Sequence, residues 1–235
     1  MMLPSLPQAT IAVAASHERF PIRRIYCVGR NYGAHAEEMG HDRREPPFFF
    51  MKPADAVVDS AVTGPVPPAT NDMHPEVELV VALAAGGRNV AVADAHALLW
   101  GAAVGVDLTR RDLQAEAKAK ARPWDMAKGF DNSAPIGPLT PIAGVPSLEH
   151  GAITLSVDGE ERQRGDLSHM IWSVAETIAH LSTLVALAPG DIIMTGTPSG
   201  VGSVRPGQTM LARIDGLEDL TVPVGSPVPT PGTGV

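Results

Sequence analysis

Cysteine, aromatic residues and clustered positive charge are all scarce in this chain of 235 residues. The single cysteine, Cys27, excludes an intramolecular disulfide, and its apolar surroundings at residues 25–28 favour a small buried residue over a nucleophile. Lysine and arginine number 18 against 26 acidic residues, the net charge is −8, and no basic run exceeds two residues. Nucleic-acid binding is therefore not expected, because neutralising phosphates requires a basic patch.

Long apolar runs are also missing. No uninterrupted apolar stretch approaches the length that a membrane-spanning helix needs. The first twenty residues lack a basic segment followed by a long apolar core, so no secretory signal is expected. These absences favour the reducing cytoplasm and exclude a membrane partner.

Glycine and proline, by contrast, are abundant, with 23 and 22 residues. So many helix breakers favour short strands and turns over a helical bundle. The segments that read as strands outnumber those that read as helices, and the two kinds do not alternate regularly. This predicts an α+β fold, with a mixed β-sheet rolled into a barrel-like shape and few helices. The expected boundaries are an N-terminal arm at 1–23, one folded catalytic domain at 24–225 and a flexible tail at 226–235.

Local signals place the main elements of this domain. Helices are predicted at residues 32–39, 91–100, 110–121 and 168–187. Thr109 and Ser168 are the expected N-caps of the last two helices. Strands are predicted at 25–28, 77–83, 102–106, 153–157, 191–194, 210–214 and 220–224, with a buried strand at the aromatic segment 48–53.

Two carboxylates lie at the start of one apolar strand, at Glu76 and Glu78. Residues two apart share a face of a strand, so both side chains are expected to point the same way. Asp107 ends another apolar run, at residues 102–106, and is placed to supply a third oxygen. Hard divalent cations prefer such ligands. The same spacing is also typical of the solvated face of a half-buried sheet, so spacing alone leaves both interpretations open.

His35 and Glu38 are three apart on a predicted helix, where they would be neighbours. A carboxylate beside an imidazole raises its basicity, which suits the pair to take a proton from water. An incidental pair on a surface helix has the same spacing. Lys128 follows Met126 and Ala127 and precedes Gly129, away from any charged face; it is suited to donate to an oxyanion or to pair with a nearby aspartate.

Arg111 and Gln114 are expected near the N-terminal end of the helix that follows Asp107, where anions are attracted. An ordinary charged helix would look the same. Gly196 and Thr197 lie in a glycine-rich loop after a strand, whose amides and hydroxyls could hold a carboxylate. The loop is not a phosphate-binding P-loop, because no Gly-Lys-Ser/Thr follows.

Together these segments resemble the fumarylacetoacetate hydrolase family. The matching segments are 28–32 (VGRNY) with His35 and Glu38, 76–79 (EVEL), 107–114 (DLTRRDLQ), 127–130 (AKGF) and 190–198 (GDIIMTGTP). They occur in order within residues 24–224 and cover nearly the whole expected domain. Within the family, residues 46–55 and 110–128 resemble the bacterial fumarylpyruvate hydrolases of gentisate breakdown.

The resemblance implies a role for each matching position. Glu76, Glu78 and Asp107 match metal ligands, usually for magnesium or manganese, with calcium as a further candidate. His35 and Glu38 match a dyad that activates water, carried on a lid over the substrate.

The resemblance also implies how the substrate is held and how the chain assembles. Lys128 matches a lysine near the substrate oxygens. The matching substrate contacts are Arg111, Gln114, Gly196 and Thr197. The family fold is a mixed β-roll, usually in homodimers, which agrees with the strand-rich pattern.

The reaction implied is hydrolysis of the C3–C4 bond of a 2,4-dioxo acid by a metal-dependent enzyme. The expected substrate is 3-fumarylpyruvate, which would give fumarate and pyruvate. Hydrolysis of another acylpyruvate, or decarboxylation of oxaloacetate at the same site, remains an alternative. A non-catalytic metal-binding scaffold is an alternative of another class.

Overall fold

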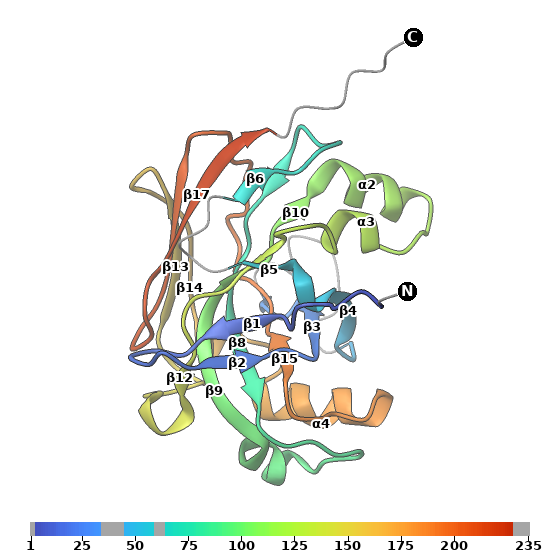
Figure 1. The fold of residues 1–235 in the computed structure, drawn as a ribbon, viewed down its shortest axis with the longest axis vertical. Helices are drawn as coiled ribbons and strands as arrows, with labels where there is room; N and C mark the ends of the chain where they lie inside the picture. The colour runs from blue at the N-terminus through green and yellow to red at the C-terminus, as the bar shows by residue number, and fades with distance from the viewer. Residues whose placement is uncertain (1–2, 34–44, 59–63, 228–235) are drawn as a thin grey trace.

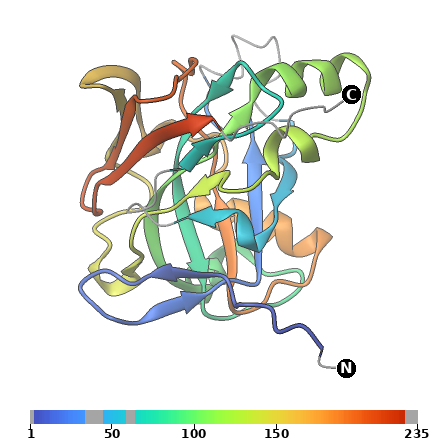
Figure 2. The ribbon, with the colours of Figure 1, turned by 45° about the horizontal axis from the view of Figure 1, so that its top comes forward.

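Two β-sheets form the body of the protein, whose computed structural model describes residues 3–33, 45–58 and 64–227 (Figures 1 and 2). The larger sheet has six strands, in the order β12 (Thr140–Pro141), β9 (Leu99–Val106), β8 (Val77–Leu83), β15 (Asp191–Met194), β3 (Arg24–Gly29) and β4 (Phe48–Lys52). The smaller has five, in the order β14 (Glu160–Asp166), β13 (Ala152–Val157), β16 (Thr209–Ile214), β17 (Leu220–Pro227) and β6 (Gly64–Val66).

Both sheets mix parallel and antiparallel pairs. Strand β15 pairs parallel with β3 and antiparallel with β8, and β17 pairs parallel with β6. Among the described residues each sheet keeps two edge strands, so the roll stays open and does not close into a barrel. The predicted α+β fold with a mixed, rolled sheet and few helices is confirmed.

Strand β8 lies at the centre of the larger sheet and is buried along its whole length. Its side chains alternate between two cores, as the period of a strand requires. Leu79 and Val81 pack into the core between the two sheets, together with residues of the smaller sheet such as Leu155. Val80 and Ala82 face a second core, which lies on the other side of the larger sheet. Because β8 packs against a core on each face, the side chains at its ends are held in fixed positions.

Three small two-stranded pairs complete the strands. They are β1 (Thr10–Ala12) with β2 (Arg19–Pro21), β7 (Met73–His74) with β10 (Thr109–Arg110), and β5 (Val57–Val58) with β11 (Ala134–Pro135). The β1–β2 hairpin covers the second core, to which it contributes Ile11 and Phe20 (Figure 2).

Helices are few and short. The α-helices are α2 (Arg111–Ala119), α3 (Asp125–Lys128) and α4 (Val174–Leu184), and the 3-10 helices are η1 (Ala54–Ala56), η2 (Val92–Leu98), η3 (Ile142–Gly144) and η4 (Leu167–His169). Helices α2 and α3 lie toward one end of the larger sheet and α4 toward the other (Figure 1). No helix in the described part of the chain is long and apolar enough to cross a membrane.

Several local predictions were wrong, each for a tertiary reason. Residues 91–100 do not form one helix: η2 ends at Leu98, and Leu99 and Trp100 already belong to β9, where Leu99 pairs with Leu83. Thr109 does not cap the helix after it but belongs to β10, and Arg110 precedes α2 without a side-chain cap. The helix predicted at 32–39 is untested, because it lies largely outside the described residues, and it stays a prediction.

The aromatic segment at 48–53 is a strand, as predicted, but it is not buried. It forms β4, an edge strand of the larger sheet, and both Phe48 and Met51 are exposed. Lys52 at its end is the buried residue, because its ammonium has partners inside the protein.

Helix α4 begins six residues later than predicted, and its cap is Ser173 instead of Ser168. Ser173 Oγ accepts a hydrogen bond from the Glu176 amide, and the Glu176 carboxylate accepts one from the Ser173 amide, which completes a capping box. Ser168 instead lies in η4, where it donates to Asp166.

Replacing Ser173 with alanine is expected to lower the free energy of unfolding by about 1 kcal/mol, because the Glu176 amide at the start of α4 loses the hydroxyl that accepts its hydrogen bond. Urea unfolding followed by circular dichroism measures this. Ser168→Ala is the matched control and is expected to change stability by less than about 0.5 kcal/mol. Equal effects of the two substitutions would contradict this assignment of the cap.

Candidate metal and substrate site

Three buried carboxylates meet at adjacent ends of β8 and β9. Glu76 directly precedes β8, Glu78 lies within it, and Asp107 directly follows β9. The antiparallel register pairs Val77 with Val106, so the start of one strand lies beside the end of the other. Oxygens of the three carboxylates lie within 4.8 Å of one another, and all three residues are buried. The structure thus brings together the three residues predicted as metal ligands.

Lys128, at the end of α3, reaches into this cluster. Its Nζ donates to Glu76 Oε2 at 2.7 Å, to Asp107 Oδ2 at 2.5 Å and to Thr109 Oγ1 at 2.6 Å. Burial alone would lower the pKa of Lys128, but the charges of Asp107 and Glu76 outweigh it and the pKa is raised. The lysine therefore stays charged. Its partners are Glu76 and Asp107, and not Asp125 or Asp131, the aspartates near it in the sequence.

Lys52 is a site residue that sequence reasoning missed. Its Nζ lies 2.8 Å from Asp107 Oδ1, and it also donates to the carbonyl oxygens of Leu108, at 3.1 Å, and of Lys128. Asp107 therefore has an ammonium group beside each of its two oxygens. The signal in the sequence was a lysine that closes an aromatic segment.

Arg111 and Gln114 come together on the first turn of α2. The Arg111 guanidinium donates to Gln114 Oε1 at 2.6 Å and to Glu76 Oε1. The Nδ1 of His74 lies 3.4 Å from Arg111 Nε, and its Nε2 lies 2.9 Å from Asp72 Oδ1. Burial and the charge of Arg111 lower the pKa of His74, so its imidazole is neutral at pH 7.

The loop after β15 closes the site from another side. The Gly196 amide donates to Glu78 Oε2 at 2.8 Å. Its φ of 95° suits glycine, and an added Cβ would lie 2.7 Å from the Cβ of Asn31, so a side chain is excluded. Thr197 Oγ1 accepts a hydrogen bond from Gln163 Nε2 at 2.8 Å and lines the pocket.

The charge of the cluster fits a divalent cation. Glu76 and Asp107 are paired with cationic side chains, whereas Glu78 receives only the Gly196 amide among the described residues. Burial, and then the charges of Asp107 and Glu76, raise the pKa of Glu78 well above its ordinary value. A cation bound to the three carboxylates would remove this repulsion, and three carboxylate oxygens are ligands that magnesium and manganese accept.

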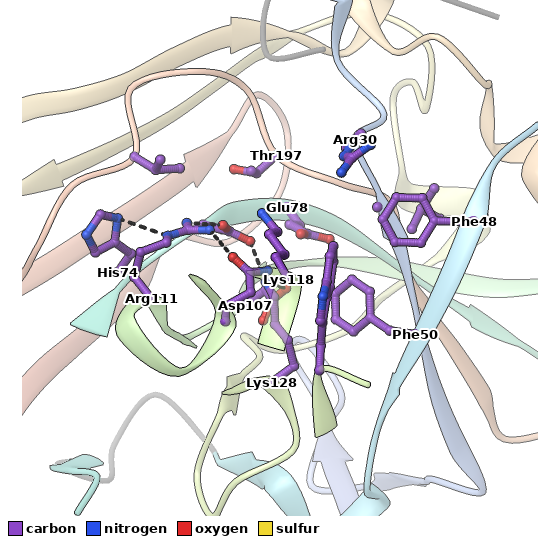
Figure 3. Close-up of a pocket in the computed structure, with 16 residues that line it drawn as sticks. Arg30, Phe48, Phe50, His74, Glu78, Asp107, Arg111, Lys118, Lys128 and Thr197 are labelled. Carbon is purple, nitrogen blue, oxygen red and sulfur yellow. Dashed lines mark hydrogen bonds and ion pairs between the residues drawn. The ribbon is translucent and has the colours of Figure 1, made fainter. Parts of the chain in front are cut away.

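A cavity of about 280 Å³ opens over the carboxylates. In Figure 3, His74 and Arg111 lie on one side of Glu78 and Asp107, and Arg30 and Phe48 lie on the other. The residues predicted to bind the metal or the substrate line this cavity, as does Lys128. The exception is Gly196, whose amide donates to Glu78 in the cavity wall.

Two other predictions have different outcomes. His35 and Glu38 lie outside the described residues, so their pairing stays a prediction. Cys27 is fully buried, and burial raises the pKa of its thiol well above the ordinary value. It therefore lacks the thiolate that a nucleophile needs, as expected from the sequence.

Comparison with known proteins identifies close relatives over nearly the whole chain. Residues 24–225 match the family model described as fumarylacetoacetate (FAA) hydrolase C-terminal. The crystal structure of a fumarylpyruvate hydrolase from Pseudomonas aeruginosa, in complex with Mn²⁺ and pyruvate, is 50% identical and superposes with a TM-score of 0.92, covering 96% of this chain and 99% of that one.

Two curated relatives carry different activities in their names. A fumarylpyruvate hydrolase of Ralstonia sp is 42% identical over 181 residues, which is 77% of this chain and 94% of the relative. A mitochondrial oxaloacetate decarboxylase of Dictyostelium discoideum is 40% identical over 198 residues, or 83% and 90%. Similar overall identity therefore accompanies both activities.

Proposed function

The chain belongs to the fumarylacetoacetate hydrolase family, enzymes that act on ketonic substrates, and from this premise we propose that it hydrolyses 3-fumarylpyruvate to fumarate and pyruvate. The observation that carries the proposal is the buried cluster of Glu76, Glu78 and Asp107 at the base of a cavity. Support comes from the 50% identical Pseudomonas aeruginosa protein, which is described as a fumarylpyruvate hydrolase with Mn²⁺ and pyruvate.

The three carboxylates would hold Mg²⁺ or Mn²⁺ in this proposal. A divalent cation supplies Lewis acidity there, which polarises a carbonyl oxygen and stabilises the negative charge that develops on it. Lys128 offsets the charge of Glu76 and Asp107 and lines the cavity, where it would donate to a substrate oxygen. Arg111 adds a second positive charge beside Glu76, which favours an anionic substrate.

His35 would act as the general base, oriented by Glu38. It removes a proton from water as the water oxygen attacks the C4 carbonyl. The C3–C4 bond then breaks, its electron pair leaves with pyruvate as the enolate, and the enolate takes up a proton at C3. The atoms of the substrate and one water thus appear as fumarate and pyruvate.

The test follows the ultraviolet absorbance of fumarylpyruvate with purified protein. Absorbance is expected to fall with Mg²⁺ or Mn²⁺ and to persist with a chelator, while fumarate and pyruvate form in equal amounts. His35→Ala is expected to lose this hydrolysis by about 10²-fold or more, because no other base is assigned to the water. His150→Ala, on an exposed turn, serves as the control and should retain activity. Persistent absorbance with the wild-type protein and both metals would refute the substrate.

A second candidate function is decarboxylation of oxaloacetate, supported by the 40% identical Dictyostelium discoideum relative. Loss of carbon dioxide from oxaloacetate also leaves the enolate of pyruvate, but it needs no attacking water. The His35→Ala variant therefore separates the two reactions, since decarboxylation would survive it. A non-catalytic scaffold would bind Mn²⁺ and turn over neither substrate.

The family resemblance also supports a homodimer with a small-molecule substrate as its other partner. Size-exclusion chromatography with light scattering measures the molar mass and so tests for the homodimer.

A further inference from the structure

The cavity contains more positive charge than its carboxylates use. Its cationic lining residues are Arg30, Arg111, Lys118 and Lys128, and its acidic ones are Glu76, Glu78 and Asp107. Arg111 and Lys128 form ion pairs within the carboxylate cluster. Arg30 and Lys118 have no ion pair among the described residues. In the part of the chain that the structure describes, the acids that line the cavity with these two cations already have other partners.

Arg30 is held in place by its neighbours. It follows β3 with a φ of 60°, an uncommon conformation for a residue other than glycine. The next residue, Asn31, is buried and fixes the backbone, because its side chain donates to the carbonyl oxygens of Thr195 and Trp172 and accepts from the Trp172 amide. The Nε of Arg30 is buried and has no hydrogen-bond partner within residues 3–33, 45–58 and 64–227. An oriented guanidinium with an unused donor is suited to an anion.

Two aromatic rings connect Arg30 to Lys118. The Arg30 guanidinium lies over the Phe48 ring, 5.4 Å from its centroid, and Lys118 Nζ lies 5.0 Å from the Trp124 centroid. The rings of Phe48 and Trp124 pack edge to face at 5.4 Å. Partial burial and then the charges of Arg111 and Arg30 lower the pKa of Lys118, which places the lysine in the field of both arginines.

We infer that Arg30 and Lys118 bind the distal carboxylate of the substrate, and that this chain therefore prefers acylpyruvates whose acyl group ends in a carboxylate. The inference rests on the proposed function, because the oxo-acid end must lie at the carboxylate cluster. Arg30 lies on the side of the cluster opposite Arg111 (Figure 3), so a substrate charged at both ends would meet a cation at each end. Phe48 and Trp124 offer apolar surface to the carbon chain between them.

The test compares fumarylpyruvate with acetylpyruvate, which has a methyl group in place of the distal carboxylate. In Arg30→Gln and Lys118→Gln, kcat/KM for fumarylpyruvate is expected to fall about 10- to 100-fold, because each loses a charged hydrogen bond. The loss should appear mainly in KM, since the contact is far from the bond that breaks. For acetylpyruvate the change should stay within about threefold. Lys120→Gln is the matched control, because Lys120 is the C-cap of the same helix but pairs with Glu116 outside the cavity.

The outcomes separate the inference from the proposed function. Equal losses on both substrates would overturn the inference and leave hydrolysis intact. If the wild-type protein hydrolyses neither substrate, the proposed function fails, and calorimetric titration of the Mn²⁺-loaded protein with fumarate then decides the inference. Fumarate binding at least about tenfold weaker in both variants supports it, since a charged contact is lost; unchanged binding overturns it.

Discussion

Replacing Glu78 with glutamine is expected to abolish activity while leaving the metal-free protein at least as stable as wild type. Glutamine keeps the size of the side chain but removes one of the three carboxylates that would hold the cation. Losing several kcal/mol of electrostatic stabilisation corresponds to a fall in kcat/KM of roughly 10³-fold. The variant should also fail to bind Mn²⁺ in a calorimetric titration.

Stability is expected to move in the opposite direction because Glu78 is buried beside two other carboxylates and, from the described residues, receives one amide hydrogen bond. Removing its charge relieves that repulsion, so the melting temperature of the metal-free protein should stay the same or rise. Glu149→Gln, on an exposed turn, is the control and should change neither property. A Glu78→Gln protein that keeps Mn²⁺ binding and turnover would rule out Glu78 as a ligand.

Replacing Lys52 with methionine is expected to lower the free energy of unfolding by about 3–5 kcal/mol, because it leaves one oxygen of the buried Asp107 without its ammonium partner. Two carbonyl oxygens, of Leu108 and Lys128, lose a donor as well. Urea unfolding of the metal-free protein measures the effect.

The exposed Lys120 provides the comparison. Its pairing with Glu116 is of the i, i+4 kind on a helix surface, so Lys120→Met should cost less than about 0.5 kcal/mol. If Lys52→Met unfolds at the same urea concentration as Lys120→Met, the buried pair with Asp107 contributes little to stability.

Local pattern was sufficient to locate the carboxylates. Glu76 and Glu78 are two apart, and Asp107 ends an apolar run, so strand periodicity and strand ends already suggested a shared site. Pattern did not identify Lys52, because its partner Asp107 is brought close only by the fold. The same holds for Lys118, whose helix looked like an ordinary charged surface until the cavity placed it near Arg30.

Elements were harder to delimit than to detect. Ser168 and Ser173 are both good caps by residue type, and only Ser173 has a glutamate three residues on that completes the capping box. Leu99 and Trp100 belong to β9 because the pairing of Leu99 with Leu83 of β8 outweighed the local helical signal. The buried carboxylate cluster also could not be told from a solvated strand face until the packing on both sides of β8 was known.

The two ends of the cavity are built differently, and this affects how such a protein can diverge. The carboxylates lie on central strands that are packed on both faces, so the core fixes their positions. Arg30, Phe48, Lys118 and Trp124 come from a strand end, an edge strand, a helix and a connecting segment, and they touch one another through ring faces rather than shared ion pairs. These residues can therefore be exchanged one at a time during evolution. Related proteins could in this way accept substrates with other acyl groups while the carboxylate end of the cavity stays the same.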